Sequence, residues 1–295
     1  MKFSVWPSYN RSWDETINLA RWAETHGFDG FWYADHMMPF RAGATADPGD
    51  AHECWTVLAA VGALVPRIRL VSMVSPVSIH HPVLLAKRAI TADHVSGGRA
   101  VLGLGAGWQV NEHAAYGFDL LEAGPRVSRF EEAIQIIRSL RSADRTTLDG
   151  TYFTVTDAPC SPKPIGPLPL LVGTGSPRML RLTARWAEEW NTWGDPDEVG
   201  RRTDRFMSAC EAVGRDPGTV RRSAQAMVYL GDAPPDGPVE RTVAGSTAQL
   251  IDQFNRYVEL GVHEFAFLDD SFGDSAEERL DNLTRLHADV LPHVP

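Results

Sequence analysis

The sequence predicts an α/β protein with the fold of a (β/α)8 TIM barrel, interrupted by an insertion between the fourth and fifth strands. Short apolar runs alternate with longer amphipathic segments along the chain, and this alternation repeats eight times. Because each strand is followed by a helix, every crossover returns the chain to the same end, which requires parallel strands. Eight such units in about 250 residues are typical of the barrel. An open, doubly wound sheet is the alternative, since the order of elements does not show closure.

The first four strand–helix units occupy the N-terminal half of the chain. The predicted strands are residues 3–6, 30–35, 69–75 and 100–105. The predicted helices are residues 13–26, 53–65, 82–95 and 126–140. Gly27 suits the C-terminal cap of the first helix, and Pro82 suits the first turn of the third. Between the second strand and the second helix, residues 37–52 are rich in Gly, Ala, Asp and Pro and are predicted as a loop.

The remaining four units follow an insertion of about residues 143–169. Within it, Asp149 and Gly150 suit the turn of a hairpin over residues 147–153, and residues 158–169 are rich in proline. The later strands are predicted at residues 170–173, 190–193, 223–230 and 264–269, and the later helices at residues 177–188, 198–213, 244–260 and 276–290. Since the strand–helix rhythm resumes directly, the insertion is not taken as an interdomain linker, and residues 1–295 are predicted to form a single domain.

Composition excludes several classes of protein. Twenty-eight basic and 38 acidic residues give a net charge of −10, which argues against a nucleic-acid-binding protein. Hydrophobic residues make up 43% of the chain, which excludes general disorder. The three cysteines show no C-x-x-C spacing, as expected in a reducing cytoplasm. There is no signal-like N-terminus and no run of about 18 apolar residues, so we expect no membrane partner.

Ligand sites of a barrel lie where strands end and helices begin, and this rule selects the candidate residues. The selected positions are Asp35 and His36, the stretch 72–76 with His80 and His81, the stretch 103–108 with Asn111 and Glu112, the stretch 173–177, Asn191 and Trp193, and Asp269 and Asp270. Gly173, Thr174, Gly175 and Ser176 suit phosphate, because small residues before a helix expose backbone N–H groups. The G-x-G-x-G at 103–107 is not a dinucleotide-binding fingerprint.

His36 is the best titratable candidate, because an imidazole beside a carboxylate at a strand end can shuttle a proton. A structural role is the alternative for a lone histidine. His80 and His81 could suggest a metal, but adjacent residues on an extended chain point apart, and no further ligands complete a site. We therefore expect no metal. Covalent hydrolysis has little support, since the chain has no G-x-S-x-G motif.

The chain resembles the luciferase-like monooxygenase superfamily, whose members use a flavin or the deazaflavin coenzyme F420. The motifs that carry the resemblance are GFDGFWYADH at 27–36, HHPVLLAKRAITADHVSGGRAVLGLGAGW at 80–108, NEHAAYG at 111–117, RVSRFEEAIQIIRSL at 126–140, DGTYF at 149–153 and PLPLLVGTGSPRMLRLTARWAEEWN at 167–191. The resemblance implies the same barrel fold. The Asp–His pair after the second strand is more similar to the F420-dependent branch, and FMN is the alternative cofactor.

The resemblance also implies roles for individual residues. His36 matches the acid/base or stabilising group beside the reactive ring, and Asp35 matches a cofactor contact. Ser72 and Met73 match the two residues joined by a non-prolyl cis peptide bond behind the ring. The residues expected to line the cofactor after the fourth strand are Gly105, Ala106, Gly107, Trp108 and Asn111. The loop expected to hold the cofactor's phosphate is Gly173, Thr174, Gly175 and Ser176.

The sequence departs from the sugar-phosphate dehydrogenases of that branch. Trp108 stands where they carry a glutamate, Phe40 replaces a tryptophan, and lysines that would hold a substrate phosphate are scarce. These exchanges indicate a small, uncharged organic substrate. The hypotheses are an F420-dependent oxidoreductase, an FMN-dependent monooxygenase fed reduced flavin by a separate reductase, and a barrel that binds a ligand without catalysis. Members of the family are often dimers, so the resemblance allows a homodimer, and the expected location is the cytoplasm.

Overall fold

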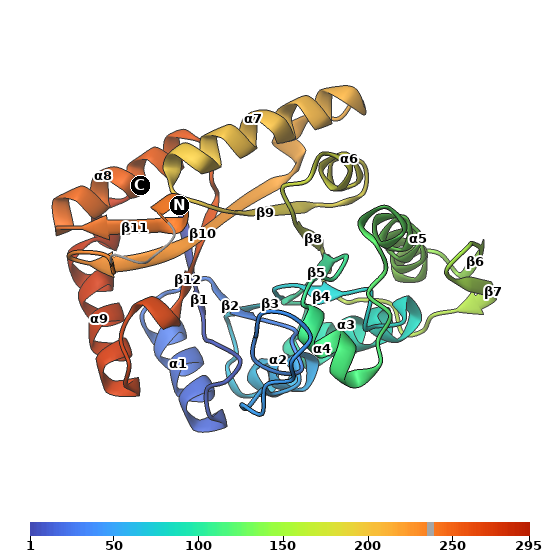
Figure 1. The fold of residues 1–295 in the computed structure, drawn as a ribbon, viewed down its shortest axis with the longest axis horizontal. Helices are drawn as coiled ribbons and strands as arrows, with labels where there is room; N and C mark the ends of the chain where they lie inside the picture. The colour runs from blue at the N-terminus through green and yellow to red at the C-terminus, as the bar shows by residue number, and fades with distance from the viewer. Residues whose placement is uncertain (235–238) are drawn as a thin grey trace. The chain divides into compact units, whose positions relative to one another are not determined.

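The computed structural model describes residues 1–234 and 239–295. Over these residues the main elements run in the order β1, α1, β2, α2, β3, α3, β5, α5, β8, α6, β9, α7, β10, α8, β12 and α9 (Figure 1). This alternation is that of a (β/α)8 barrel, and it confirms the predicted fold class. The chain divides into two compact units: residues 1–8, 12–32 and 174–295 form unit 1, and residues 9–11 and 33–173 form unit 2. The single-domain organisation stays a prediction.

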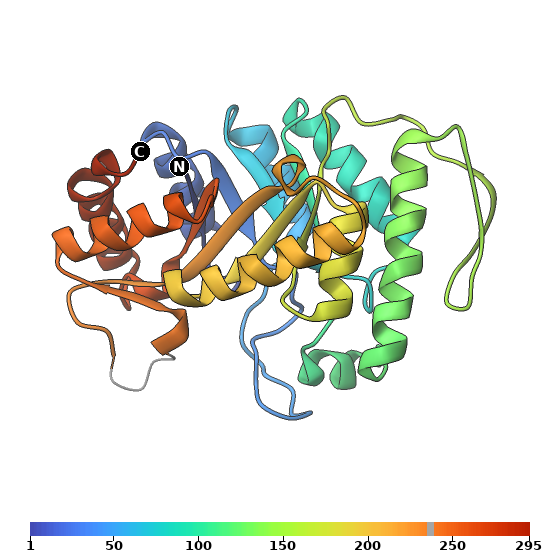
Figure 2. The ribbon, with the colours of Figure 1, turned by 90° about the horizontal axis from the view of Figure 1, so that it is seen from above.

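Unit 2 contains a parallel sheet covered by helices. Its strands are β3 (Arg69–Ser72), β4 (Ser75–Pro76), β5 (Ala100–Gly105) and β8 (Leu170–Gly173), and β5 pairs with each of the others. Its helices are α2 (Cys54–Leu64), α3 (Pro82–Ser96), α4 (Val110–Tyr116) and α5 (Ala123–Ser142). Phe130, Ile134 and Ile137 of α5 are fully buried, as their helical spacing predicts. Figure 2 shows α3 beside α5.

The predicted insertion contains the hairpin of β6 (Arg145–Asp149) and β7 (Thr154–Pro159), which pair in antiparallel fashion apart from the main sheet. Its turn is held by α5, because the Glu132 carboxylate accepts hydrogen bonds from the backbone N–H groups of Thr151, Tyr152 and Phe153. A hairpin is therefore confirmed, and it packs on α5 within unit 2 (Figure 1). Its predicted bounds are wrong, because Asp149 still pairs with Thr154 and the second strand begins only there.

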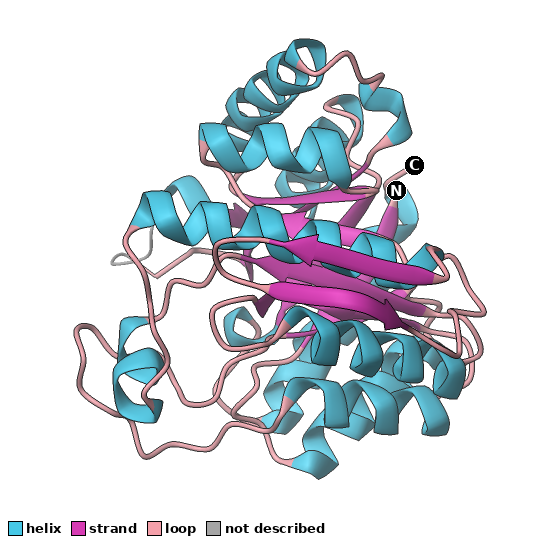
Figure 3. Ribbon diagram, turned by 90° about the vertical axis from the view of Figure 1, so that its right-hand side faces the viewer, coloured by secondary structure: helices cyan, strands magenta, loops and turns pink. Residues whose placement is uncertain are grey.

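Unit 1 contains the other parallel strands and the C-terminal helices. Its strands are β1 (Lys2–Trp6), β2 (Gly30–Tyr33, whose last residue falls in unit 2), β9 (Glu189–Trp193), β10 (Arg221–Leu230), β11 (Thr242–Gly245) and β12 (Glu264–Leu268). Its helices are α1 (Trp13–Thr25), α6 (Pro177–Trp186), α7 (Pro196–Ala212), α8 (Thr247–Glu259) and α9 (Ala276–Asp289). In Figure 3 helices lie along the strands. Trp190 of β9, for example, stacks on Phe206 of α7 at 4.4 Å.

The predicted strands 30–35 and 69–75 are too long, since β2 ends at Tyr33 and β3 at Ser72. Two helices differ from the prediction as well. The predicted helix 244–260 begins three residues later, because Ala244 and Gly245 pair with Tyr229 and Leu230 as part of strand β11. The chain turns into α8 only at Ser246, whose side chain accepts a hydrogen bond from Gln249 N in a capping box. The short helix α4 was not predicted, because seven residues carry too little periodicity to stand out.

The described helices include none that is long and apolar enough to cross a membrane. All three cysteines are buried free thiols. Burial, together with the negative charge of Asp35, raises the pKa of the Cys54 thiol well above its ordinary value. A thiol held in its protonated form is a poor nucleophile, so Cys54 serves as a small apolar side chain of the core.

Candidate active site

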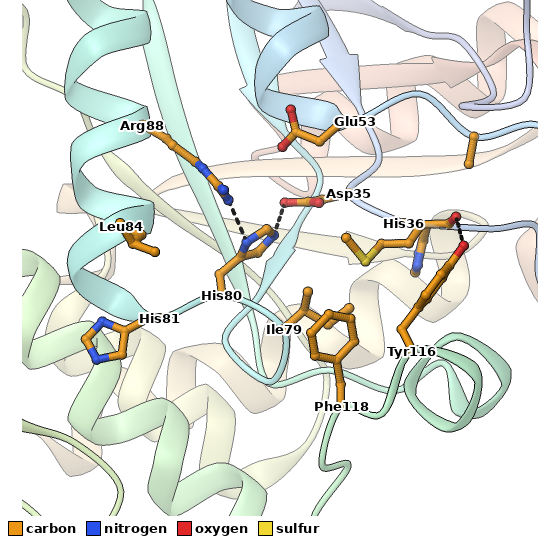
Figure 4. A pocket seen from close by; sticks show the side chains of 12 residues that line it. Asp35, His36, Glu53, Ile79, His80, His81, Leu84, Arg88, Tyr116 and Phe118 are labelled. Carbon is orange, nitrogen blue, oxygen red and sulfur yellow. Dashed lines mark hydrogen bonds and ion pairs between the residues drawn. The ribbon is translucent and has the colours of Figure 1, made fainter.

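A pocket of about 410 Å³ lies in unit 2 where β2 ends and α2 and α3 begin. It brings together residues from four separate stretches of the chain, as Figure 4 shows. The lining residues are Asp35, His36, Met37, Ala51, Glu53, Ile79, His80, His81, Leu84, Arg88, Tyr116 and Phe118. The end of the second strand is thus a functional candidate in the structure as well as in the sequence.

His36 is held by a buried carboxylate. Its Nδ1 lies 3.1 Å from Oε1 of Glu112, which is 1% exposed. The other carboxylate oxygen, Oε2, accepts a hydrogen bond from the backbone N–H of Met37 at 2.9 Å. Since a carboxylate only accepts, Nδ1 of His36 carries the proton. In the neutral ring Nε2 is therefore the nitrogen with a free lone pair, as in a base that a carboxylate orients.

Helix α4 places Glu112 beside His36. Two buried amides tie the start of this helix to the loop after His36, because Nε2 of Gln109 donates to Met38 O at 3.0 Å and Nδ2 of Asn111 donates to Pro39 O at 2.9 Å. Glu112 lies in the first turn of α4, where a negative charge is favoured by the helix dipole. Glu112 is among the predicted strand-end positions, but the sequence predicts no role for it, because its partner is 76 residues away in the chain.

Aromatic rings surround the imidazole of His36 in unit 2. The ring of Tyr9 lies 5.4 Å from it, and the ring of Trp108 meets it edge-on at 5.5 Å. Phe40 packs on Trp108 at 5.3 Å, and these two side chains are 56% and 55% exposed. Large aromatic side chains so exposed beside a polar group are typical of a surface that receives a flat or apolar ligand. His36 and Trp108 are thus neighbours, and their roles toward a cofactor stay predictions.

Asp35 points away from His36 into a second network. Its Oδ2 accepts hydrogen bonds from Oγ of Ser75 at 2.5 Å and from Nε2 of His80 at 2.9 Å. Nδ1 of His80 in turn accepts from Nη1 of Arg88 at 3.0 Å, so the proton of this ring is on Nε2 (Figure 4). Burial would raise the pKa of Asp35, but the attraction and hydrogen bond of His80, the hydrogen bond of Ser75 and the charge of His36 hold it below its ordinary value.

His80 and His81 point apart, as expected for neighbours on an extended chain. His81 caps α3, because its Nδ1 accepts from the backbone N–H of Val83 at 3.3 Å, and its ring contacts Phe153. Over residues 1–234 and 239–295, no group of three or more His, Cys, Asp or Glu side chains could hold a metal ion.

The family model of the luciferase-like monooxygenases matches residues 1–236. The chain belongs to the luciferase-like monooxygenase family. An F420-dependent glucose-6-phosphate dehydrogenase of Microbacterium testaceum is 34% identical to it over 185 residues, which are 62% of this chain and 54% of that protein. The chain thus spans about half the length of that relative. An F420-dependent hydroxymycolic acid dehydrogenase of Mycobacterium tuberculosis is 29% identical over 223 residues, 74% of this chain and 60% of the relative.

Solved structures of similar fold cover the whole chain. An F420-dependent secondary alcohol dehydrogenase in complex with an F420–acetone adduct superposes with a TM-score of 0.84 at 18% identity, over 100% of this chain and 99% of that one. The F420-dependent tetrahydromethanopterin reductase of Methanopyrus kandleri reaches a TM-score of 0.83 at 16% identity, over 100% and 99%. At such low identity the likeness shows the fold alone, which is that of the luciferase-like barrels.

The predicted position of the non-prolyl cis bond in this luciferase-like chain is wrong by one residue. The cis bond joins Met73 and Val74, not Ser72 and Met73. Met73 follows the last residue of β3, and its N–H still donates to Tyr33 O of β2 at 2.7 Å. Ser72 is a structural link, since its Oγ accepts from Gly103 N at 2.9 Å. A Cβ on Gly105 would lie 2.7 Å from the Val74 side chain, so the glycine lets β5 lie close to Val74.

The predicted phosphate loop of the family lies at the start of α6. Ser176 is the N-cap of α6 but makes no side-chain capping bond, and Pro177 follows at the first position. A Cβ on Gly175 would lie 3.2 Å from Nη1 of Arg202 on α7, so a guanidinium flanks the loop within unit 1. Nε of Arg202 donates to Oε1 of Glu198 at 2.5 Å, so its charge is shared with that carboxylate. The uncapped N–H groups at the helix N-terminus suit an anion. Arg202 was missed in the sequence, because it lies in none of the family motifs.

The remaining predicted residues follow β5. Gly107 has φ +95°, and a Cβ there would lie 2.0 Å from Ser78 Oγ, so only glycine fits. Its carbonyl accepts from Nη1 of Arg126 at 2.9 Å. Oδ1 of Asn111 is buried and has no hydrogen-bond partner among the described residues. Asn111 thus keeps an acceptor for a ligand, and the cofactor-lining roles of Gly105, Ala106, Gly107, Trp108 and Asn111 stay predictions.

Proposed function

We propose that this luciferase-like protein is an F420-dependent oxidoreductase that transfers a hydride between the deazaflavin and a small, uncharged organic substrate. One observation carries the proposal: His36 is oriented through Nδ1 by the buried Glu112, and its Nε2 accepts no hydrogen bond from a described residue. An imidazole held in this way is built to exchange a proton with a bound molecule. The F420-dependent names of the relatives and of the structural neighbours support the choice of cofactor.

His36 supplies the proton transfer that accompanies hydride transfer. When an alcohol is oxidised, its carbon loses a hydride and its oxygen loses a proton, and Nε2 of His36 takes that proton. In the opposite direction Nε2 returns the proton to the oxygen of the carbonyl. Glu112 stabilises the imidazolium that forms, because its carboxylate stays hydrogen-bonded to Nδ1–H. F420, when bound, supplies the hydride acceptor or donor, and the protein supplies orientation and the proton.

The described residues fit an anionic deazaflavin in two places. In unit 1, the uncapped start of α6 after Thr174, Gly175 and Ser176, with Arg202 beside it, would hold a phosphate of the cofactor's tail. In unit 2, the exposed rings of Trp108 and Phe40 near His36 would contact a flat ring system or the substrate. Asp35 is proposed to support this region through Ser75 and His80, and a direct contact of its Oδ1 with the cofactor remains part of the proposal.

Titration with the two cofactors tests the proposal. The protein is mixed with F420 and, separately, with FMN, and binding is followed by fluorescence quenching. We expect F420 to bind in the micromolar range or below and FMN to bind at least tenfold more weakly. F420-coupled oxidation is then followed by the absorbance of F420 with a panel of secondary alcohols and aldehydes. Tight binding of FMN without binding of F420, with O₂ consumed on addition of reduced FMN, would favour the monooxygenase instead.

We also propose a homodimer in the cytoplasm. Exposed apolar side chains on neighbouring helices support an interface between copies: Leu64 of α2 and Leu84 and Val95 of α3. The buried free cysteines are compatible with a reducing compartment. Light scattering after size-exclusion chromatography tests the assembly, and a mass of 32.5 kDa instead of twice that value would contradict it.

A further inference from the structure

The strands of unit 1 have one apolar face and one polar face. Phe3 of β1 and Phe265 of β12 contact Phe254 of α8, so one face packs on helices. Side chains alternate along a strand, so the residues between these point to the opposite face. The pairing register puts there Ser4 and Trp6 of β1, Asn191 and Trp193 of β9, Ser223 and Gln225 of β10, and Glu264 and Ala266 of β12.

At the amino ends of these strands the polar face is saturated with hydrogen bonds. Glu264 is fully buried, and its Oε1 accepts from Nε1 of Trp32 at 3.0 Å and from the hydroxyl of Ser4. Its Oε2 accepts from Nη2 of Arg221 at 2.9 Å. The negative charge is thus matched by a positive one, as buried charges require. The hydrogen bonds of Glu264 at this end of the face stabilise the fold, and both of its oxygens are already occupied.

At the carboxyl ends the same face carries polar atoms without partners. Gln225 is fully buried, yet within the part of the chain that the structure describes neither its Oε1 nor its Nε2 has a hydrogen-bond partner. The same holds for Nε1 of Trp6, whose side chain is 8% exposed, and for Oδ1 of Asn191. The ring of Trp6 lies 5.7 Å from that of Trp193, which is opposite Gln225 in the register. Each such atom costs about 1–3 kcal/mol of folding free energy.

The groups without partners are neutral. Asp269, the residue directly after β12, accepts from Ser8 N at 2.9 Å through Oδ1, and its Oδ2 faces Nε of Arg279 at 3.8 Å. The charge of Asp269 is therefore matched by the protein itself. What remains is an amide that can both donate and accept, an indole donor and an amide acceptor. The guanidinium of Arg241 lies 5.9 Å from the centroid of the Trp193 ring and makes its contact with that ring. The buried atoms without partners are themselves neutral, and a neutral group that both donates and accepts would satisfy them all.

We propose that Trp6, Asn191 and Gln225 form a subsite that binds a neutral polar group of the substrate, with the ring of Trp193 as its wall. The group has an oxygen that accepts from Trp6 Nε1–H or Gln225 Nε2–H and a hydrogen that it donates to Gln225 Oε1 or Asn191 Oδ1, as in a hydroxyl or a carboxamide. This inference rests on the proposed function, since it deepens the substrate class of the oxidoreductase. Buried atoms without hydrogen-bond partners lower the stability of the fold, and such a loss is common where a site must bind a ligand.

Four probes that share a phenyl ring with one carbon substituent test the subsite: benzamide, benzyl alcohol, benzoate and toluene. Dissociation constants are measured with the full chain by ligand-observed NMR titration. We expect benzamide or benzyl alcohol to bind at least fivefold more tightly than both benzoate and toluene. Gln225→Met, which keeps the length of the side chain, is expected to abolish this preference. Trp6→Phe, which keeps the ring without its N–H, is expected to reduce it severalfold.

Thermal unfolding of the ligand-free variants separates a binding role from a structural one. Gln225→Met removes atoms without partners, so its Tm is expected to equal or exceed that of the wild type. The matched control is Gln253→Met on α8, because Nε2 of Gln253 donates to Ala244 O at 3.1 Å. This control is expected to lower the Tm slightly and to keep the probe preference. A fall in Tm for Gln225→Met larger than for the control, with the preference intact, would overturn the proposal.

The remaining outcomes of the probe titration also support or refute the subsite. Equal binding of all four probes, no binding of any, or tightest binding of benzoate would refute the subsite. Probe selectivity is independent of the cofactor, so the two proposals fail separately. Selective binding of benzamide by a protein that does not bind F420 would retain the subsite and refute the oxidoreductase. Binding of F420 with turnover but without probe selectivity would do the reverse.

Discussion

Two histidine–carboxylate pairs of similar geometry lie in unit 2. They differ in whether the second nitrogen of the imidazole is already hydrogen-bonded to the protein. His36 lies 3.1 Å from Glu112, and His80 lies 2.9 Å from Asp35. Both nitrogens of His80 are used, because Arg88 donates to the second one. His36 uses only Nδ1, and its ring is partly exposed among aromatic side chains. The same pair of residue types thus forms a structural tie in one place and a candidate proton carrier in the other.

The largest expected effect is at the free nitrogen of His36. His36→Asn keeps a donor near the position of Nδ1 for Glu112 but has no counterpart of Nε2. We expect turnover to fall about 100-fold, and at least tenfold, because a positioned acid or base typically contributes about 10²–10⁴. The rate is measured by the absorbance of F420 with the best alcohol or ketone of the panel. The dissociation constant for F420 should stay within about twofold of the wild type, and an unchanged turnover would remove His36 from the mechanism.

Substitution in the His80–Asp35 pair should lower the stability of the protein rather than its turnover. His80→Ala leaves the buried Asp35 without its principal partner and leaves Arg88 without an acceptor. Breaking a buried pair from one side costs about 3–5 kcal/mol, so we expect the free energy of unfolding at pH 7 to fall by about 3 kcal/mol. Urea unfolding followed by circular dichroism measures it. His36→Asn is the matched control, with an expected loss of less than about 1 kcal/mol, because it keeps a donor to Glu112.

The stability penalty of His80→Ala should depend on pH in a defined direction. In the wild type the pKa of Asp35 is held below its ordinary value, so its contribution to stability is present above the unfolded pKa of about 3.9 and is lost as pH falls through the folded pKa. Without His80, burial is the dominant influence and raises the pKa of the folded state. Protonation then favours the folded variant, and the difference from the wild type narrows as pH falls from 7 to 4. A penalty that stays constant over this range would contradict the assignment.

Glu112 should have a smaller effect on turnover than His36. Its two oxygens accept from His36 and from Met37 N–H, and the amide of Glu112→Gln has only one acceptor for these two donors. We expect kcat to fall about tenfold with little change in KM, since the base is misoriented and its cation is less stabilised. Glu112→Asp should recover part of the loss because it restores the carboxylate. Equal losses in both variants would point to a purely steric role.

Sequence reasoning predicted what depends on local pattern and missed what depends on contacts far apart in the chain. The eight strands and their helices follow from apolar periodicity, and the end of β2 with His36 follows from the rule for barrels. The partners of these residues were not readable, because Glu112 and His80 lie 76 and 45 residues from His36 and Asp35. Arg202 likewise reaches the Gly175 loop from α7. The side chain of Gln225 is buried without hydrogen-bond partners among the described residues. This depends on tertiary packing, so the sequence pattern does not predict it.

The smallest expected effect on stability is at the exposed rim of the His36 site. Trp108→Ala removes a ring that is 55% exposed and contacts His36 and Phe40, so the free energy of unfolding should change by less than about 0.5 kcal/mol. If Trp108 contacts the cofactor or the substrate, its loss removes apolar contact area from the complex and raises KM or the F420 dissociation constant about three- to tenfold. Trp108→Phe, which keeps an aromatic surface, should restore most of the affinity. An alanine variant with unchanged kinetic constants would limit the site to His36 and its carboxylate, without the aromatic rim.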